Sequence, residues 1–485
     1  MSFSTRTELM RHQPPAVAKL LPSRVGGLFM DMGTGKSRTL LELARIRQEK
    51  FDRLFWFCPC SGRDTIAHEV TKHTTLTGAD ICIFDDATSE RTVPRDRRIY
   101  VIGTESMSAS DRVVLAYNSL VTEQSFVAVD ESQYIKGPRA KRTQRITHMS
   151  ERARYRAVLT GTPFSQGAVD LYAQMRFLSQ KILGYKSFWS FAANHLEYEE
   201  RKDAYGRKRR TGRILRSHNE DYLAAKIAPY TYQVRKDECL DLPEKLYEDR
   251  YCRMTGEQRA YYEQAKDEIL LSCDYDDWNP VRLFHLFSTL QTIVCGFWNR
   301  TDPATGQTKL IEIAHNRLAL LLDTIAEIPE SEPVIIWAKF HHAVRQIREA
   351  LAEIYGAEQV AEFHGKMGDS KRASALARWR AGARFLVATQ DTGGQVHTFN
   401  EAAYALFYAD SFKYDKRRQA EDRNHRIGQT RRPVYGTLRC LDSIDARIAQ
   451  AIERKGNALE AFQDRLDVYR RQGMKKQAIE LVRAL

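Results

Sequence analysis

The chain has 485 residues, of which 43% are hydrophobic and 28% are charged, as is ordinary for a globular protein of two or three domains. It contains no apolar run of about 18 residues, the length that a membrane-spanning helix needs, and its N-terminal residues lack the apolar core of a secretory signal. The formal net charge of +13 favours polyanionic partners, because each phosphate that a cation neutralises releases counterions. A merely basic protein would have the same charge, so the motifs must decide.

Short apolar runs of strand length recur along both halves of the chain, with helix-patterned segments between them. They occupy residues 26–31, 53–58, 81–84, 99–103, 126–130 and 157–161, and then 333–340, 384–389, 405–410 and 434–438. Strands that alternate with helices indicate parallel sheets. Two such series, separated by more than a hundred residues, predict two α/β lobes.

The intervening stretch, about 175–310, is predicted to be helical, with amphipathic runs at 261–271 and 281–294. It includes a basic run at 201–216 that holds eight Lys or Arg residues and one acidic residue. We expect this run to be a DNA-contacting loop, with Arg207, Arg209 and Arg210 as the contacts. A solvated, mobile insertion is the alternative, since charge runs are usually just exposed.

The eight cysteines do not form the CxxC pairs that a zinc site or a redox motif needs. They stand at positions 58, 60, 82, 239, 252, 273, 295 and 440. We expect reduced thiols in a cytoplasmic protein.

A glycine-containing loop follows the first strand and opens a helix. It consists of Met32, Gly33, Thr34 and Gly35. The glycines let the backbone curl so that its N–H groups point at phosphate oxygens. Lys36 would reach the β- and γ-phosphates of ATP, and Ser37 would bind Mg²⁺. Met30 stands where the GxxxxGKS pattern has its first glycine.

An acidic pair, Asp130 and Glu131, ends the strand at 126–130. Asp130 would hold Mg²⁺, and Glu131 would polarise the water that attacks the γ-phosphate. Alone such a pair is usually only solvated, but together with the phosphate loop it predicts an ATPase.

Five further segments carry a resemblance to the Swi/Snf-type ATPases of helicase superfamily two. They are residues 58–73 (motif Ia), 130–137 (motif II), 158–166 (motif III), 235–245 (the link between lobes) and QAEDRNHRIGQ at 419–429 (motif VI). The similarity covers about residues 8–455. It implies two RecA-like lobes with parallel sheets, at 1–178 and 311–485, and a helical insertion and linker at 179–310.

The resemblance also implies roles for particular residues. Gln13 matches the glutamine that reads adenine, Arg423 and Arg426 match the arginines that reach the γ-phosphate, and Gln419 lies beside them. The residues implied in a track along DNA phosphates are Ser61, Thr104, Lys136, Gly365 and Gly394. Thr104 and Gly365 match loosely and are equally typical of turns.

This sequence departs from the family in two places that bear on coupling. Gln133 replaces a histidine in motif II, and Thr398 replaces an asparagine in motif V. Gln133 can still hydrogen-bond across the site, so we expect hydrolysis to survive while coupling differs.

The resemblance implies an ATP- and Mg²⁺-dependent translocase on double-stranded DNA without base specificity. The alternatives are a strand-separating DNA or RNA helicase and, from another class, a catalytically idle DNA-binding scaffold. We further expect a monomer in the cytoplasm of a bacterial or phage-infected cell, with no membrane association, and other DNA-processing proteins as partners.

Overall fold

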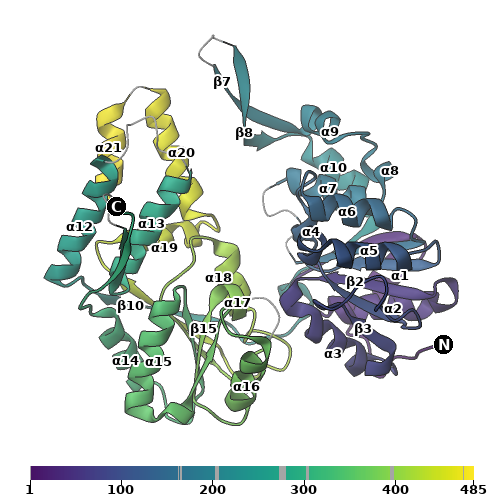
Figure 1. Cartoon of the computed structure of the whole chain (residues 1–485), viewed down its shortest axis with the longest axis horizontal. Helices are drawn as coiled ribbons and strands as arrows, with labels where there is room; N and C mark the ends of the chain where they lie inside the picture. Colours follow the sequence, from purple (N-terminus) through teal and green to yellow (C-terminus); the bar gives the residue numbers. More distant parts are fainter. Residues whose placement is uncertain are drawn as a thin grey trace. The chain divides into compact units, whose positions relative to one another are not determined.

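The computed structural model describes residues 2–161, 163, 167–202, 207–271, 280–301, 305–393, 398–472 and 474–485. The chain divides into two compact units, Met1–Asp241 (unit 1) and Leu242–Leu485 (unit 2) (Figure 1). Each unit has its own parallel sheet and its own hydrophobic cores. The predicted α/β class with two parallel sheets is therefore confirmed.

Unit 1 is built on a seven-stranded sheet of order β3-β4-β2-β5-β6-β1-β9, in which every neighbouring pair is parallel. Its strands are β1 (Val25–Met30), β2 (Arg53–Cys58), β3 (Ile81–Ile83), β4 (Ile99–Gly103), β5 (Ser125–Val129), β6 (Tyr155–Thr160) and β9 (Thr231–Val234). The central strands are buried along almost their whole length. Burial on both faces explains why they read as continuous apolar runs.

Helices cover both faces of this sheet, because side chains alternate between the faces along each strand. In β2, Leu54 and Trp56 face one core, and Phe55 and Phe57 face the other. The first core is completed by α1 (Gln13–Leu20), α2 (Lys36–Arg47) and α3 (Arg63–His73). The second is completed by residues of α4 (Ser106–Ala109), α5 (Asp111–Leu120), α6 (Lys141–Ser150), α7 (Val169–Leu178), α8 (Gln180–Leu183), α9 (Phe188–His195) and α10 (Glu220–Ile227).

Unit 2 has a six-stranded sheet of order β10-β17-β16-β13-β15-β14, again parallel throughout. Its strands are β10 (Leu246–Cys252), β13 (Val334–Ala338), β14 (Val360–Phe363), β15 (Phe385–Thr389), β16 (Tyr404–Phe407) and β17 (Val434–Cys440). Helices α14 (Arg317–Ala326) and α15 (His341–Tyr355) cover one face. Helices α16 (Asp369–Arg380) and α18 (Tyr414–Glu421) pack on the other.

A further helical cluster in unit 2 has its own core and a short hairpin beside it. Its helices are α12 (Gly256–Leu271), α13 (Pro280–Val294), α19 (Ile444–Glu453), α20 (Ala458–Arg471) and α21 (Lys475–Arg483). The hairpin pairs β11 (Phe297–Thr301) with β12 (Thr308–Glu312). The described residues also include the short α-helices α11 (Lys236–Cys239) in unit 1 and α17 (Gln390–Gly393) in unit 2.

The stretch 179–310, predicted as a helical insertion, is shared between the units and contains strands as well as helices. The basic run predicted as a loop contributes to an antiparallel hairpin of β7 (Leu196–Lys202) and β8 (Lys208–Ser217). The dense charges of this segment hid its strand pattern, in which Leu196 and Tyr198 alternate with glutamates.

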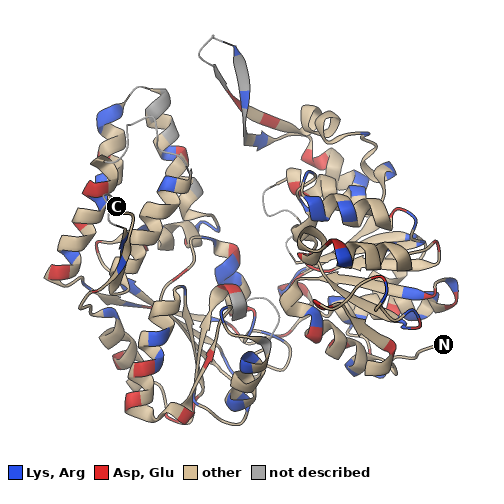
Figure 2. Cartoon of the chain, viewed as in Figure 1, with Lys and Arg blue, Asp and Glu red and all other residues tan. Residues whose placement is uncertain are grey.

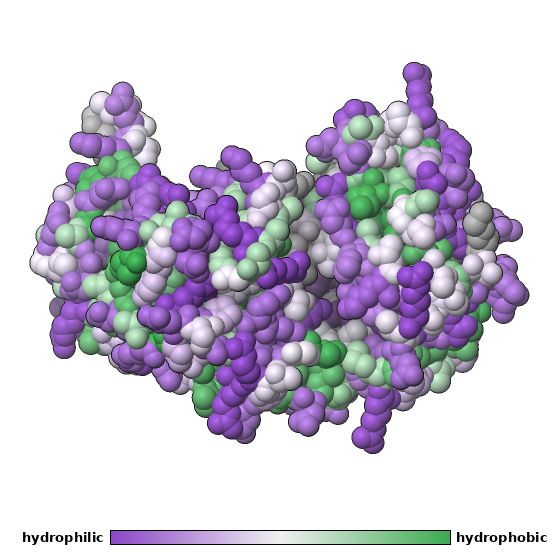
Figure 3. All heavy atoms as spheres, turned by 90° about the horizontal axis from the view of Figure 1, so that it is seen from below, coloured by the Kyte–Doolittle hydropathy of each residue, from purple (hydrophilic) through white to green (hydrophobic). Residues whose placement is uncertain are grey.

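Within the described residues, no helix is long and apolar enough to cross a membrane. On the face drawn in Figure 3, hydrophilic side chains predominate and apolar residues form small separate patches. Such patches are ordinary on a globular protein.

Candidate functional site

The loops that carry the motifs meet at one edge of the sheet in unit 1. Strand β6 lies between β1 and β5, and all three run parallel. The phosphate loop follows β1, the acidic pair follows β5, and motif III begins at the end of β6. Parallel strands end at the same edge, so chain segments far apart in sequence are brought together there.

The phosphate loop has the curled backbone that its glycines predict. Gly33 and Gly35 adopt φ angles of 83° and 79°, in the left-handed region that favours glycine. A Cβ atom at Gly35 would lie 2.3 Å from Nε2 of Gln13, so only glycine fits. The Lys36 ammonium donates to the carbonyl oxygens of Met30 (2.9 Å) and Asp31 (3.3 Å). The Lys36 side chain therefore lies back against the start of the phosphate loop.

Gln13 and His12 hold this loop from the start of α1. Gln13 is fully buried, accepts from the Met10 N–H (2.8 Å) and donates to the Gly35 carbonyl (2.9 Å). Nε2 of His12 lies 2.7 Å from the Thr34 carbonyl oxygen. Adenine recognition by Gln13 stays a prediction, but its contact with the loop is direct.

The acidic pair lies at the carboxyl end of β5. Desolvation by the surrounding protein and the negative charge of Glu131 raise the pKa of Asp130 to about 7, although Lys36 acts in the opposite direction. A divalent cation would favour the ionised form of such a pair. Asp130 and Ser37 are thus suitable oxygen donors for Mg²⁺.

Glu131 has an uncommon backbone conformation, with φ 48° and ψ 53°. Non-glycine residues rarely occupy this region, and such strain is concentrated at functional sites. The conformation allows the Glu131 carboxylate to accept a hydrogen bond from Gln133 Nε2 at 2.6 Å.

Gln133 connects motif II to motif III. Besides its bond to Glu131, it accepts a hydrogen bond from the Thr160 hydroxyl at 2.8 Å. Gln174, fully buried on α7, adds a second connection, because it accepts from the Ser132 hydroxyl (2.6 Å) and donates to the Pro163 carbonyl (3.1 Å). The sequence pointed to Gln133 but gave no signal for Gln174.

The residues predicted to follow DNA phosphates in unit 1 have different environments. Ser61 is exposed just after β2. Thr104 is fully buried, and its hydroxyl donates to the Cys58 carbonyl (3.1 Å). Lys136 lies 3.4 Å from the carboxylate of buried Asp170. A phosphate role stays a prediction for all three, and the geometry favours Ser61.

In unit 2 the arginines of motif VI lie in the loop after α18. Arg426 is half-buried and donates to the hydroxyl of Thr398 (2.9 Å), so the residue that departs from motif V holds the arginine of motif VI. Arg423 is only 2% exposed. Gln419 is half-buried on α18, and Gly365 is exposed after β14. Gly394 lies outside the described residues, and of Arg209 only the backbone is described.

Two buried polar residues that sequence reasoning missed shape this loop. Gln429 donates to three carbonyl oxygens, those of Asn400, Ala402 and Asn424 (3.1–3.2 Å). The Asn424 side chain donates to Ala402 (3.3 Å) and accepts from the hydroxyl of Tyr435 (3.0 Å). Their position inside the motif was the available signal, since buried amides of this kind hold a loop in one conformation.

Glu421, at the end of α18, is the centre of a buried ionic cluster. It accepts from Arg417 (2.8 Å), Lys245 (2.8 Å) and the hydroxyl of Tyr247 (2.9 Å). Burial raises the pKa of Glu421, but the two cations outweigh this effect, and the pKa lies below its ordinary value. Arg417 also donates to both oxygens of Asp410 (2.9 and 3.0 Å).

The link between the units is bonded to a motif loop at each end. In unit 1 the N–H of Lys236 donates to the carboxylate of Asp31 (3.1 Å), which directly precedes the phosphate loop. In unit 2 the carbonyl oxygen of Pro243 lies 2.9 Å from Nε2 of His425 in motif VI, and Lys245 pairs with Glu421.

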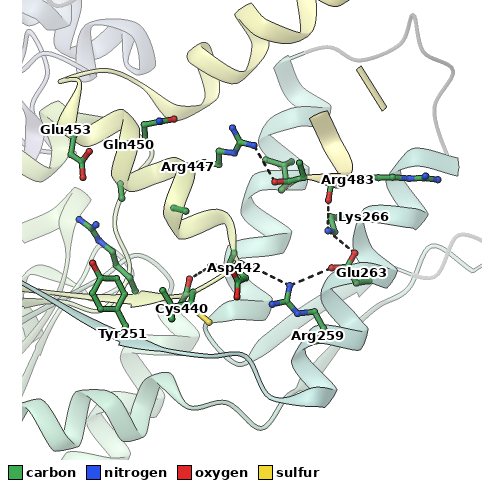
Figure 4. A pocket seen from close by; sticks show the side chains of 17 residues that line it. Tyr251, Arg259, Glu263, Lys266, Cys440, Asp442, Arg447, Gln450, Glu453 and Arg483 are labelled. Carbon is green, nitrogen blue, oxygen red and sulfur yellow. Dashed lines mark hydrogen bonds and ion pairs between the residues drawn. The ribbon is translucent and has the colours of Figure 1, made fainter. Parts of the chain in front are cut away.

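A cavity of about 810 Å³ in unit 2 is unrelated to these residues, because none of the predicted site residues lines it. Figure 4 shows Arg259, Glu263 and Lys266 of its lining turned toward one another. Glu263 pairs with Lys266 (2.8 Å) and Arg259 (3.8 Å). These cations are already partnered, so the cavity carries no ligand assignment.

Replacing Glu421 by Gln should destabilise unit 2 at neutral pH by about 3–5 kcal/mol, because Arg417 and Lys245 lose a buried counter-charge. Because the pKa of Glu421 is lower in the folded protein than in the unfolded chain, its ionised carboxylate stabilises the fold at any pH above the unfolded-state pKa. This stabilisation is lost as the pH falls through the folded-state pKa. The difference from the wild type should therefore shrink below about pH 4. Denaturant unfolding at several pH values measures it.

The matched control is Glu453→Gln, an exposed position on α19, for which we expect a change within about 0.5 kcal/mol. Equal stability of the two variants at neutral pH would contradict the role assigned to the cluster.

Comparison with known proteins gives a match to the SNF2-related domain over residues 16–295. YwqA of Bacillus subtilis is 23% identical over 340 residues, which are 68% of this chain and 34% of that protein. An uncharacterized ATP-dependent helicase of Mycoplasma pneumoniae is 21% identical over 360 residues, 72% of this chain and 32% of the relative. The chain thus spans about a third of the length of these relatives.

Among solved structures, the Sulfolobus solfataricus SWI2/SNF2 ATPase core in complex with dsDNA is 19% identical, with a TM-score of 0.43, over 94% of this chain and 92% of the other. The core domain from the same organism is 20% identical, with a TM-score of 0.40, over 93% and 89% of the two chains.

Proposed function

The chain belongs to the SNF2-related family, the Swi/Snf-type ATPases of helicase superfamily two, and on that premise we propose that it hydrolyses ATP to ADP and phosphate while moving along double-stranded DNA. The observation that carries the proposal is the convergence at one sheet edge of Lys36, the Asp130–Glu131 pair and the Gln133–Thr160 connection. Each group suits one part of phosphoryl transfer.

Unit 1 supplies the phosphate-binding half of this chemistry. Lys36 would leave the carbonyls that it now contacts and bind the β- and γ-phosphates. Asp130 and Ser37 would hold Mg²⁺, which when bound offsets charge on the phosphate oxygens. Glu131 would orient the attacking water and accept its proton. Its hydrogen bond from Gln133 ties that carboxylate to Thr160.

Unit 2 supplies the arginines. In the proposed cycle the lobes close over ATP, and Arg426 exchanges the Thr398 hydroxyl for a γ-phosphate oxygen. A planar, permanently charged guanidinium stabilises the charge that develops in transfer. Arg423 is more deeply buried and would act beside it after the loop moves. The link at residues 235–245 contacts Asp31 at one end and Glu421 and His425 at the other. Closure of the lobes would therefore be transmitted to both motif loops through this link.

Contacts to phosphates position a protein without reading sequence, so we infer little base specificity. Ser61 and Gly365 are exposed after strand ends in their own units and are the residues best placed for such contacts. The net charge of +13 supports a polyanionic track.

The deciding experiment is steady-state ATP hydrolysis measured in parallel with no nucleic acid, duplex DNA, single-stranded DNA and RNA. We expect strong stimulation by duplex DNA, followed by displacement of a triplex strand as evidence of movement. Stimulation by single strands or RNA alone would instead favour a strand-separating helicase or an RNA motor. Absence of turnover with every substrate would leave a DNA-binding scaffold.

Replacing Glu131 by Gln should abolish turnover and leave ATP binding intact, because the amide cannot accept the proton of the attacking water. Single-turnover hydrolysis and nucleotide binding are measured on the same preparation. Glu123→Gln, at an exposed position before β5, is the control and should behave as the wild type. Full hydrolysis by the Glu131 variant would show that Glu131 is not the general base.

Replacing Arg426 by Ala should lower turnover by about 10³-fold or more, as expected for an arginine that stabilises the transferred phosphoryl group. The control is Arg432→Ala, since Arg432 lies in the same region but is exposed and only weakly paired, at 3.5 Å from Glu244. Near-normal turnover of the Arg426 variant would show that the lobes do not close in the proposed way.

A further inference from the structure

The β7–β8 hairpin is a ribbon of two strands that no third described strand joins. Figure 1 shows it extending from unit 1 beyond α9 and α10. An isolated two-stranded hairpin is marginally stable in water, so its retention as a long extension needs an explanation. A ribbon of this width can enter the major groove of B-form DNA.

Positive charge is concentrated on one strand of the ribbon and toward its far end. Between residues 207 and 217 there are six Lys or Arg residues and no acidic one, namely Arg207, Lys208, Arg209, Arg210, Arg213 and Arg216. Nearer the base, Arg216 pairs with Glu197 on the other strand. Figure 2 shows the acidic residues of β7 in this lower part.

Farther out, the strand register contains one pair of opposite charge and two pairs of like charge. Glu200 is opposite Arg210, whereas Arg201 is opposite Arg209 and Lys202 is opposite Lys208. Like charges directly opposite one another destabilise a strand pair. A polyanion lying along the ribbon would remove this penalty.

The base of the ribbon is anchored firmly. Leu196, Tyr198 and Ile214 pack on the core of unit 1. His195, which is 1% exposed, has its Nε2 2.7 Å from the Tyr185 hydroxyl and its Nδ1 3.1 Å from the carbonyl oxygen of His218. The base of the ribbon is therefore fixed to unit 1.

This base lies beside the loops that handle nucleotide. A Cβ atom at Gly167 would lie 3.1 Å from Oγ of Ser217, so the end of β8 lies against the segment that follows motif III. Arg139, in the loop after motif II, lies with its guanidinium 4.6 Å from the ring centroid of Trp189 on α9.

Aromatic rings contact cations both on the ribbon and at its base. Arg210 lies over the ring of Tyr198 at 5.6 Å, and Trp189, which Arg139 covers, is 54% exposed. A guanidinium stacked on a ring keeps its N–H edges available for phosphate oxygens. Arg207, Arg210 and Arg139 are all exposed.

We propose that the β7–β8 ribbon is a DNA arm of this ATPase, in which Arg207 and Arg210 bind phosphates of the duplex and Arg139 continues the contact at its base. The inference rests on the proposed function and adds to it a contact surface outside the motifs. An acidic protein surface would suit the charge equally, but the attachment of the arm to the loops after motifs II and III favours the substrate whose movement those loops would drive.

The test is binding of a short fluorescent duplex at a series of salt concentrations, without nucleotide, by the wild type and by the double variant R207Q/R210Q. Each lost phosphate contact lowers the slope of log affinity against log salt by about 0.9, so the double variant should lose about 1.8. The control is K19Q/K50Q, which removes the same charge from exposed positions that precede β1 and β2. It should keep the wild-type slope.

If the wild type binds duplex normally and the salt-dependence slope of R207Q/R210Q is unchanged, the proposed DNA arm is wrong and the ribbon binds another partner. An equal loss in both double variants would overturn it too, since only overall charge would matter. Both arginines are exposed, so the thermal unfolding midpoint of R207Q/R210Q should equal that of the wild type and shows that the variant is folded. Failure of the wild type itself to bind duplex would instead reject the proposed function.

Discussion

Parallel pairing of β5, β6 and β1 brings three carboxyl ends to one edge of unit 1. The phosphate loop, the acidic pair and motif III are separated by up to about 130 residues of chain, yet each begins where one of these strands ends. The pairing depends in turn on strands that are apolar on both faces, because helices must cover both sides of a parallel sheet. Chemistry at this edge is therefore a consequence of how the core is packed.

Buried polar side chains then set the conformations of the motif loops. Gln13 fastens the phosphate loop, Gln174 joins the segments after β5 and β6, and Gln429 gathers three carbonyls in the arginine loop. An unsatisfied buried amide is costly, so each of these residues selects one loop conformation. Glu421 does the same with charge, since three donors meet on one buried carboxylate.

These buried polar side chains lie in or beside the loops whose functional residues would change partners during catalysis. In the proposed cycle, Lys36 and Arg426 exchange their present hydrogen bonds for phosphate oxygens, whereas Glu131 keeps its hydrogen bond from Gln133. The amides that hold the surrounding loops, Gln13, Gln174 and Gln429, are buried, whereas Lys36, Glu131 and Arg426 are half-buried. The proposed cycle requires Lys36 and Arg426 to change partners, and a stable scaffold would limit movement to them.

Local chemistry let the sequence alone determine the class of fold, the phosphate loop with its two left-handed glycines, the acidic pair and the family resemblance of motif VI. These features depend on residue type at short spacing, which a sequence displays directly. Only the tertiary structure decided that Thr398 holds Arg426, that the hydroxyl of buried Thr104 donates to a backbone carbonyl, and that residues 196–202 pair with residues 208–217 as strands. Each of these depends on which distant segments pack together, and a single sequence does not encode that pairing in any local pattern.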